Sequence, residues 1–286
     1  MDPLTAPARS WLFVPATRPE RFAKAAASGA DRVIVDLEDA VAPGEKAAAR
    51  RALAGAPLPA SVPVYLRVND ASTEWFAEDV AAAARLALAG VVLPKAESAA
   101  QVARAASALG SRKAIVAIVE SAAALWGALE VARAPNVERL AFGAFDFQLD
   151  TAIAGDDVEL AYARSRLVLA SRVAGVGAPI DSVTAAIDDP ERVARDAERS
   201  LRFGFAGKLC IHPRQVAPTH AAFRPGAADV EWATGLLAAY DALPEGARGA
   251  FAYRGGMVDR PVLLRARRIA ALARADAARR AEDAPP

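Results

Sequence analysis

The sequence predicts a (β/α)8 barrel, a closed sheet of eight parallel strands surrounded by helices. Eight short runs rich in Val, Ile and Leu alternate with segments rich in Ala, Leu, Arg and Glu over most of the 286 residues. A continuous apolar run is typical of a strand buried on both faces, and alternating strands and helices require a parallel sheet. An open doubly wound sheet commonly has a glycine-rich turn after its first strand. Here the first strand leads into residues 14–19, VPATRP, so we favour the barrel.

The predicted strands and helices alternate from the N-terminus to about residue 213. The strands are expected at residues 10–15, 32–38, 62–68, 90–95, 113–120, 139–146, 178–183 and 207–213. The helices between them are expected at residues 19–28, 45–53, 74–89, 98–109, 122–132, 158–174 and 190–203. Ser98 and Asp189 are candidate N-caps, whereas Gly29, Gly90 and Gly110 are candidate helix ends.

The region after the eighth strand has a different character. The eighth helix is expected at residues 227–242, and with it the barrel would span residues 1–242. Residues 246–261 are glycine-rich and irregular, and a basic helix is expected at 262–280. Because a barrel does not need this extension, we expect residues 243–286 to form a C-terminal arm and helix that covers the barrel mouth or contacts a neighbouring subunit.

Composition narrows the class of protein. The net charge is +1, from 35 basic and 34 acidic residues, which argues against a nucleic-acid or membrane-surface partner. Cys210 is the single cysteine, so no internal disulfide can form and a reducing compartment is expected. The N-terminus lacks the pattern of a signal peptide, and the apolar runs are too short to span a bilayer. These features predict a cytoplasmic protein.

The strand ends carry the chemistry. Barrel active sites lie at the carboxyl ends of the strands. Nearly every predicted strand ends at or near a group that can ionise, coordinate or donate: Arg18, Glu38, Asp39, Arg67, Asn69, Lys95, Glu120, Asp146, Asp181 and His212. Such a repeated pattern is hard to explain by chance, so we expect an active site at this rim.

Glu120 and Asp146 end two consecutive strands, which would place both carboxylates side by side. Mg²⁺ prefers oxygen ligands and keeps several waters, so one or two carboxylates and a chelating substrate complete its shell. With two histidines and one cysteine in the chain, a zinc site of His and Cys ligands is disfavoured. The alternative is that each carboxylate caps a helix or pairs with an arginine. We predict a Mg²⁺ site.

Arg67 suits a substrate carboxylate or an enolate oxygen, because its planar guanidinium binds such groups in a bidentate manner. It could equally form a structural ion pair with Glu38 or Asp39, and that pair could orient it toward the substrate. Adjacent residues of a strand point to opposite faces, so one of these two acids would face the mouth. We expect both to support the site rather than to bind the metal.

Lys95 has three possible roles. It could form a Schiff base with a carbonyl substrate, bind a phosphate or carboxylate as a point charge, or make an ion pair. With a metal site available, we disfavour the Schiff base.

The remaining rim residues are weaker candidates. His212 could be a general base, but a hydrogen bond to its own loop is preferred. Asp181 and Ser182 are less favoured, and Cys210 is expected in the core.

Seven motifs in order resemble the citrate lyase β-subunit-like family of the aldolase and CoA-ester lyase superfamily, over residues 9–268. The ordered set is specific, although no single motif would be. They are residues 9–50 (from RSWLFVP to EKAAAR), LRVN (66–69), LPKAE (93–97), IVES (118–121), FGAFD (142–146), GFAGKLCIHPRQV (204–216) and GGMVDRP (255–261).

The resemblance implies a TIM barrel, a Mg²⁺ ion held by Glu120 and Asp146, and a carbon–carbon lyase reaction or its reverse. It implies that Arg67 and Glu120 contact the substrate. It also implies that Asp259, in the GGMVDRP motif, acts as acid or base from an adjacent subunit. Family members are commonly trimers or dimers of trimers, so a homotrimer or homohexamer is expected.

Two departures from the family pattern bear on the substrate. Residues 16–18, Ala-Thr-Arg, stand where many relatives have a glycine after the proline, which could alter a phosphate or CoA contact. Phe145 replaces a small or acidic residue and is expected to narrow the substrate pocket.

The expected reaction is cleavage of a malyl-, citramalyl- or citryl-type 3-hydroxyacyl-CoA thioester to a 2-oxo acid and acetyl-CoA, or the reverse condensation. The alternatives are a 2-oxo acid aldolase that does not use CoA, an acyl-CoA thioesterase, and a non-catalytic lyase subunit.

Overall fold

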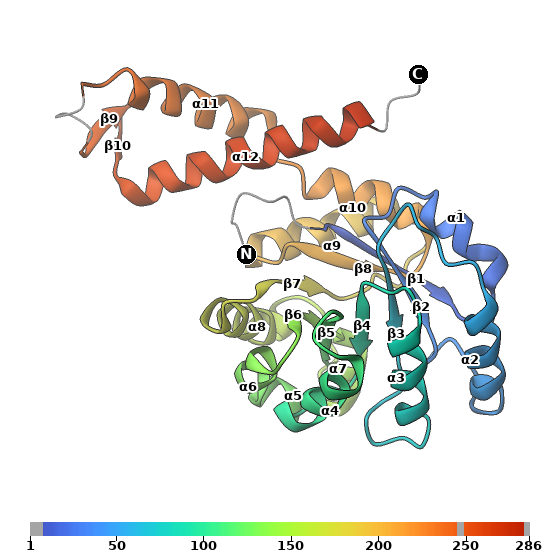
Figure 1. Cartoon of the computed structure of the whole chain (residues 1–286). Helices are drawn as coiled ribbons and strands as arrows, with labels where there is room; N and C mark the ends of the chain where they lie inside the picture. Colours follow the sequence, from blue (N-terminus) through green and yellow to red (C-terminus); the bar gives the residue numbers. More distant parts are fainter. Residues whose placement is uncertain (1–7, 245–248, 283–286) are drawn as a thin grey trace. The chain divides into compact units, whose positions relative to one another are not determined.

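A computed structural model describes residues 8–244 and 249–282 of the chain. Eight parallel strands form a closed barrel in which each strand pairs with the next and β8 pairs with β1 (Figure 1). The predicted (β/α)8 barrel is therefore confirmed. The strands are β1 (Ser10–Pro15), β2 (Arg32–Asp36), β3 (Val64–Arg67), β4 (Gly90–Leu93), β5 (Ala114–Val119), β6 (Val137–Phe142), β7 (Gly177–Asp181) and β8 (Gly207–Cys210).

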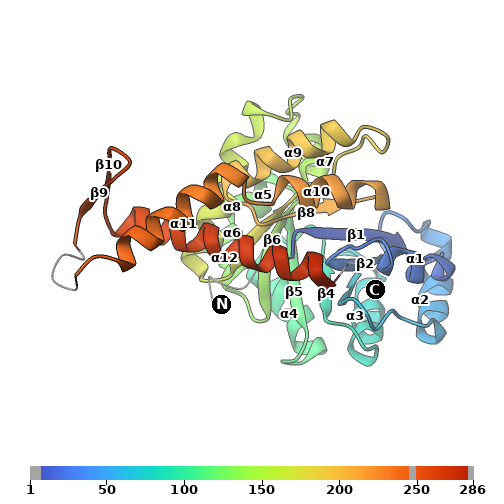
Figure 2. The same cartoon turned by 90° about the horizontal axis from the view of Figure 1, so that it is seen from above.

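Helices surround the barrel on its outer side (Figure 2). The α-helices of this part are α1 (Phe22–Ala26), α2 (Lys46–Gly55), α3 (Phe76–Arg85), α4 (Ala99–Leu109), α5 (Ala122–Trp126), α6 (Ala128–Arg133), α7 (Ala144–Thr151), α8 (Ala161–Ala174), α9 (Pro190–Phe203) and α10 (Val216–Ala222). Short 3-10 turns are η1 (Pro19–Arg21), η2 (Pro43–Glu45), η3 (Val158–Leu160) and η4 (Pro213–Gln215).

Two of these helices were not predicted. The start of α7 lies within the apolar run at 139–146, which the sequence pattern assigned wholly to a strand; the strand instead ends at Phe142, before Gly143. Helix α10 carries Pro218 in its first turn and is short, so its periodicity is weak. It packs against β1 and α9, the place that the prediction gave to residues 227–242.

Residues alternate between two cores along each strand. Ile34, Val116, Ile180 and Leu209 belong to the core inside the barrel. Their neighbours in sequence belong to the larger core between the barrel and the helices, as Val33 and Val35 do on either side of Ile34. This alternation decides which rim side chains face the barrel axis.

Most of the predicted helix signals are found in the structure. Ser98 forms a capping box with Gln101, and the Asp189 side chain accepts a hydrogen bond from the Arg192 amide. Gly110, with φ +72°, follows α4. Gly90 does not end a helix; it opens β4, where a Cβ atom would lie 2.2 Å from the Ala114 carbonyl oxygen.

The chain divides into two compact units, with a boundary between Phe223 and Arg224. The second unit contains α11 (Ala227–Asp241), the hairpin of β9 (Phe251–Tyr253) and β10 (Gly256–Val258), and α12 (Arg260–Glu282). The second unit therefore begins before residue 243, where the C-terminal arm was expected to start, and within it α11 packs against α12.

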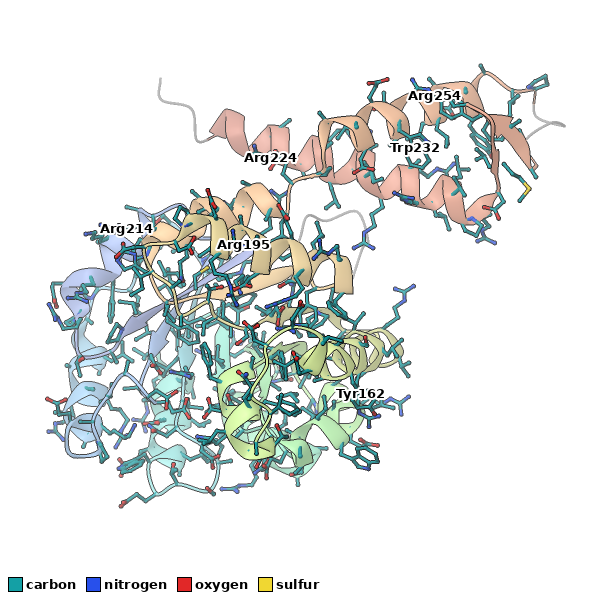
Figure 3. The ribbon with its side chains drawn as sticks, turned by 180° about the vertical axis from the view of Figure 1, so that it is seen from behind. Tyr162, Arg195, Arg214, Arg224, Trp232 and Arg254 are labelled. Atoms are coloured by element: carbon teal, nitrogen blue, oxygen red, sulfur yellow. The ribbon has the colours of Figure 1, made fainter. Side chains whose placement is uncertain are left out.

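A separate apolar cluster explains this division. Ala233 and Leu236 of α11 pack with Val258, Leu263 and Ala266 of the hairpin and α12. Figure 3 labels Trp232, which packs against this cluster, and Arg254, which pairs with Glu231 at 3.0 Å. Within the described residues, none of the helices combines the length and the apolar character needed to cross a membrane.

Candidate active site

A cavity of about 370 Å³ lies where the inward-facing ends of β2, β3 and β5 meet the first turn of α7. Its polar wall is formed by Asp36, Asp39, Arg67, Glu120 and Asp146. Its apolar wall includes Phe13, Ile118, Val183 and Leu209. The cavity thus combines an acidic side, a single guanidinium and an apolar side, as expected of a site for a small polar ligand.

Glu120 and Asp146 both line this cavity, as the strand-end argument requires. Asp146 does not end a strand: β6 stops at Phe142, and Asp146 lies in the first turn of α7. Strand β5 pairs with β6 so that Val119 is opposite Phe142, which places Glu120 beside Gly143. Glu120 is buried, and its Oε1 accepts a hydrogen bond of 2.8 Å from the Lys95 amide.

Gly143 leaves the space that Glu120 occupies. A Cβ atom at this position would lie 2.3 Å from Glu120 Oε2 and 2.6 Å from Glu120 Cβ. No side chain other than hydrogen fits there without displacing the carboxylate. This role of Gly143 was not predicted, although a glycine between an apolar strand and an acidic helix turn could have suggested it.

The site has an excess of negative charge. Five carboxylates, those of Asp36, Glu38, Asp39, Glu120 and Asp146, are grouped with the cations Arg67 and Lys95. Burial raises the pKa of Glu120 to about 8, and the charges of Glu38 and Asp146 add to this. Burial likewise raises the pKa of Glu38 to about 7, with contributions from Asp39 and Asp36, against the opposing effect of Arg67.

Such a site favours binding of a cation. A divalent ion would favour the ionised forms of Glu120 and Asp146, and oxygen donors suit Mg²⁺. In the described parts of the chain, no group of three or more His, Cys, Asp or Glu side chains is arranged to bind a metal ion. Glu120 and Asp146 line the same cavity, and two carboxylates with water and substrate oxygens are a donor set that suits Mg²⁺.

Arg67 is held by three acids. Its Nε and Nη2 donate to Asp36 Oδ1 and Oδ2 at 2.7 and 2.6 Å, and its Nη1 lies 2.9 Å from Glu38 and 3.1 Å from Asp39. Burial by itself would lower the pKa of Arg67, but these carboxylates outweigh burial and raise it. Arg67 thus remains protonated and fixed, with its guanidinium over the Phe13 ring.

Asp36 is the main residue of this group that the sequence argument missed. It is the last residue of β2, is 2% exposed, and lies opposite Arg67 in the strand register. A buried carboxylate at a strand end was the available signal. The strand was predicted to run to residue 38, whereas β2 ends at Asp36.

Lys95 is placed as an ion-pair partner. It has a positive φ of +46°, and its Nζ lies 3.3 Å from Glu38 Oε1. Burial would lower the pKa of Lys95, but Glu38, Glu120 and Asp146 outweigh burial and raise it. An ammonium group held protonated is a poor nucleophile, which argues against the Schiff base.

Three other rim residues have structural contacts instead of lining the cavity. Asn69 donates to Asp79 on α3, Asp181 accepts from Arg164 on α8, and His212 Nδ1 accepts from the Arg214 amide in its own loop. The preferred role of His212 is thus the one found. Cys210 is buried in the core, where burial raises its pKa to about 11.

Phe145 and Asp259 have different surroundings. Phe145 lines the cavity from the first turn of α7 and is 51% exposed. Asp259 belongs to the second unit and immediately precedes α12, where its Oδ1 accepts a hydrogen bond of 3.2 Å from the Val262 amide.

Residues 9–213, which include all eight barrel strands, match the model of the HpcH/HpaI aldolase/citrate lyase family. The chain belongs to this family. A citrate lyase subunit beta-like protein of Deinococcus radiodurans is 41% identical over 276 residues, covering 91% of this chain and 95% of that protein. The resemblance stated from the sequence motifs is confirmed.

Other members of the family differ in their assigned activity. A (3S)-malyl-CoA thioesterase of Cereibacter sphaeroides is 32% identical, covering 96% of this chain and 98% of that protein. The crystal structure of CitE from Mycobacterium tuberculosis with magnesium, acetoacetate and coenzyme A is similar with a TM-score of 0.83 and 38% identity, covering 94% of this chain and 98% of that chain. A citrate lyase beta subunit of the same organism, with oxaloacetate and magnesium, has a TM-score of 0.69 at 38% identity, covering 79% of this chain and 100% of that chain.

Proposed function

We propose that this member of the HpcH/HpaI aldolase/citrate lyase family is a Mg²⁺-dependent carbon–carbon lyase. Its substrate would be a malyl-, citramalyl- or citryl-type 3-hydroxyacyl-CoA thioester, cleaved to a 2-oxo acid and acetyl-CoA, or formed in the reverse condensation. The observation that carries this proposal is the grouping of Glu120, Asp146 and Arg67 on one cavity wall. Magnesium with oxaloacetate, and magnesium with coenzyme A, in structures of relatives support it.

Glu120 and Asp146 would hold the metal, and Glu120 would also contact the substrate. When bound, Mg²⁺ supplies a positive charge that polarises the oxygens of the acid. The Lys95 amide orients Glu120, and the apolar wall with Phe145 limits water around the acyl chain. Phe145 is thus our candidate for the residue that sets the size of the acid.

In cleavage, the 3-hydroxyl would give its proton to a base, for which Asp259 is also the candidate, while the C2–C3 bond breaks and a carbonyl forms on the 2-oxo acid. The electron pair passes to the thioester as an enolate, which is then protonated at C2. Arg67, which is fixed by Asp36, would stabilise the negative charge that develops at the cavity wall. Asp259 is our candidate for the acid that delivers the C2 proton, in keeping with its GGMVDRP motif.

A substrate panel tests this function. Purified protein with Mg²⁺ is offered malyl-, citramalyl- and citryl-CoA, and release of a 2-oxo acid is measured. We expect turnover of at least one thioester, and loss of turnover in Glu120→Gln and Asp146→Asn. Full activity of both variants would contradict the mechanism.

A thioesterase is the second candidate, because the relatives at 32% identity include a (3S)-malyl-CoA thioesterase. Water reaching the acyl carbonyl would then release free CoA and malate without any 2-oxo acid. The same panel separates the two reactions if both free CoA and 2-oxo acid are measured.

Two further experiments separate the remaining alternatives. Enolisation of pyruvate that needs Mg²⁺ but not acetyl-CoA would indicate a 2-oxo acid aldolase. No turnover without acyl-carrier and transferase proteins would indicate a lyase subunit.

We further propose a cytoplasmic homotrimer or homohexamer, in which residues 243–286 and Asp259 reach a neighbouring subunit. The molar mass in solution tests the oligomeric state.

A further inference from the structure

The helix that carries Asp146 has no cap of its own. Helix α7 begins at Ala144 after Gly143, which has no side chain to accept a hydrogen bond from the first turn. The Ala144 amide instead donates to Ser182 Oγ, at 3.1 Å, from the end of β7. A residue distant in sequence thus performs the capping that Ser or Asp at the N-cap normally performs.

Ser182 is itself fixed from two sides. Its amide donates to Asp181 Oδ1 at 2.9 Å, and its carbonyl oxygen accepts a hydrogen bond of 2.6 Å from Lys208 Nζ. Ser182 is 5% exposed and Lys208 is 3% exposed, so neither group can exchange these partners for bulk water. A buried hydroxyl and a buried lysine amino group keep such bonds because breaking them is costly.

Lys208 lies outside the candidate active site. Its neighbour Leu209 faces the inside of the barrel, which turns Lys208 toward the helices. There it lines a second cavity of about 230 Å³ with Asp181 and Asp196, while Ser182 lines both cavities. Lys208 can therefore affect the site through Ser182 without touching a substrate.

We propose that Ser182 and Lys208 are positioning residues for Asp146: Lys208 fixes the end of β7, Ser182 fixes the first turn of α7, and that turn presents the carboxylate to Mg²⁺. This inference rests on the proposed metal site. It extends that site to two residues that would neither bind the ion nor take part in bond cleavage. Groups that hold metal ligands in place typically change metal affinity by about 10- to 100-fold when removed.

The alternative is that these contacts only hold the barrel to its helices. Ser200 offers a matched control for that case. It is a fully buried serine of α9 whose Oγ lies 2.6 Å from Asp181 Oδ2, so it belongs to the same hydrogen-bonded group. Ser200 makes no described bond to α7.

The experiment compares Ser182→Ala with Ser200→Ala in the full-length protein. Mg²⁺ affinity is measured by isothermal titration calorimetry, and thermal unfolding is measured without metal. We expect Ser182→Ala to bind Mg²⁺ about 10- to 100-fold more weakly and Ser200→Ala to keep the wild-type affinity. Equal Mg²⁺ affinities in these two variants would overturn the inference.

Two further variants complete the design. Asp146→Asn must lose Mg²⁺ binding; if it does not, the proposed metal site and this inference both fail, whereas an unaffected Ser182→Ala alone refutes only the inference. Lys208→Met should weaken Mg²⁺ binding, and adding Ser182→Ala to it should have little further effect, because the two groups act in series. Fully additive effects would remove Lys208 from the proposal.

Discussion

Gly143→Ala tests whether the shape of the barrel rim determines metal binding. The added Cβ would lie 2.6 Å from Glu120 Cβ and 3.1 Å from Ile118 Cγ2. Rotation of the Glu120 side chain cannot relieve the first contact, because a Cβ atom is fixed to the backbone. The two strand ends must separate by roughly 1 Å to restore ordinary carbon–carbon contact.

The cost of that separation has two parts. Overpacking a close contact of this kind costs about 1–3 kcal/mol of folding free energy. Mg²⁺ requires near-ideal octahedral geometry at about 2.0–2.1 Å, so a ligand displaced by roughly 1 Å is lost to the ion. We therefore expect Gly143→Ala to weaken Mg²⁺ binding by at least about tenfold, which corresponds to about 1.4 kcal/mol.

Gly44→Ala is the matched control, since a Cβ at Gly44 would meet nothing within 4 Å. Calorimetric titration with Mg²⁺ and thermal unfolding with and without the ion are measured for both variants. Mg²⁺ should raise the midpoint of unfolding of Gly44→Ala as in the wild type, and raise that of Gly143→Ala much less. Wild-type Mg²⁺ affinity in Gly143→Ala would refute the reasoning.

Four further predictions concern charge and burial. Asp36→Asn removes a charged partner of Arg67 and should lower the free energy of unfolding by about 1.5–3 kcal/mol, measured by urea denaturation; an unchanged midpoint would show that Glu38 and Asp39 suffice. Mg²⁺ affinity should increase as the pH rises toward 8 and beyond, because the ion must displace the proton of Glu120, whose pKa is about 8; a flat profile by calorimetry would contradict this. In the metal-free protein the contribution of Glu120 to stability is fully present below the ordinary carboxyl pKa of 4.5 and is lost as the pH rises through about 8, and Glu120→Gln should remove this pH-dependent loss. Cys210, with a pKa of about 11, should not react with a thiol reagent at pH 8 until the protein is denatured; rapid reaction of the native protein would disprove its burial.

The sequence by itself determined the barrel and predicted the rim at which the candidate active site lies. Apolar runs and helix-forming segments are local properties, and their alternation leaves few topologies. Acidic residues after buried strands then identify the rim. For this reason the sequence predicts that Glu120 and Asp146 lie there, although it does not predict helix α7.

Only the tertiary structure decided which rim residues face the cavity. Arg67 and Asp181 both end barrel strands, yet Arg67 faces the cavity and Asp181 turns to Arg164 between the barrel and its helices. The direction depends on the exact residue at which each strand starts and ends, and periodicity locates strand ends only to within about 2–4 residues.

The tertiary structure also decided what holds the proposed metal ligands in place. Gly143 is needed because Glu120 fills the space of a side chain, and Ser182 caps a helix that starts 38 residues earlier in the chain. Contacts between distant segments leave no local periodicity in the sequence. For the same reason α11 was assigned to the barrel, although its apolar face packs against α12.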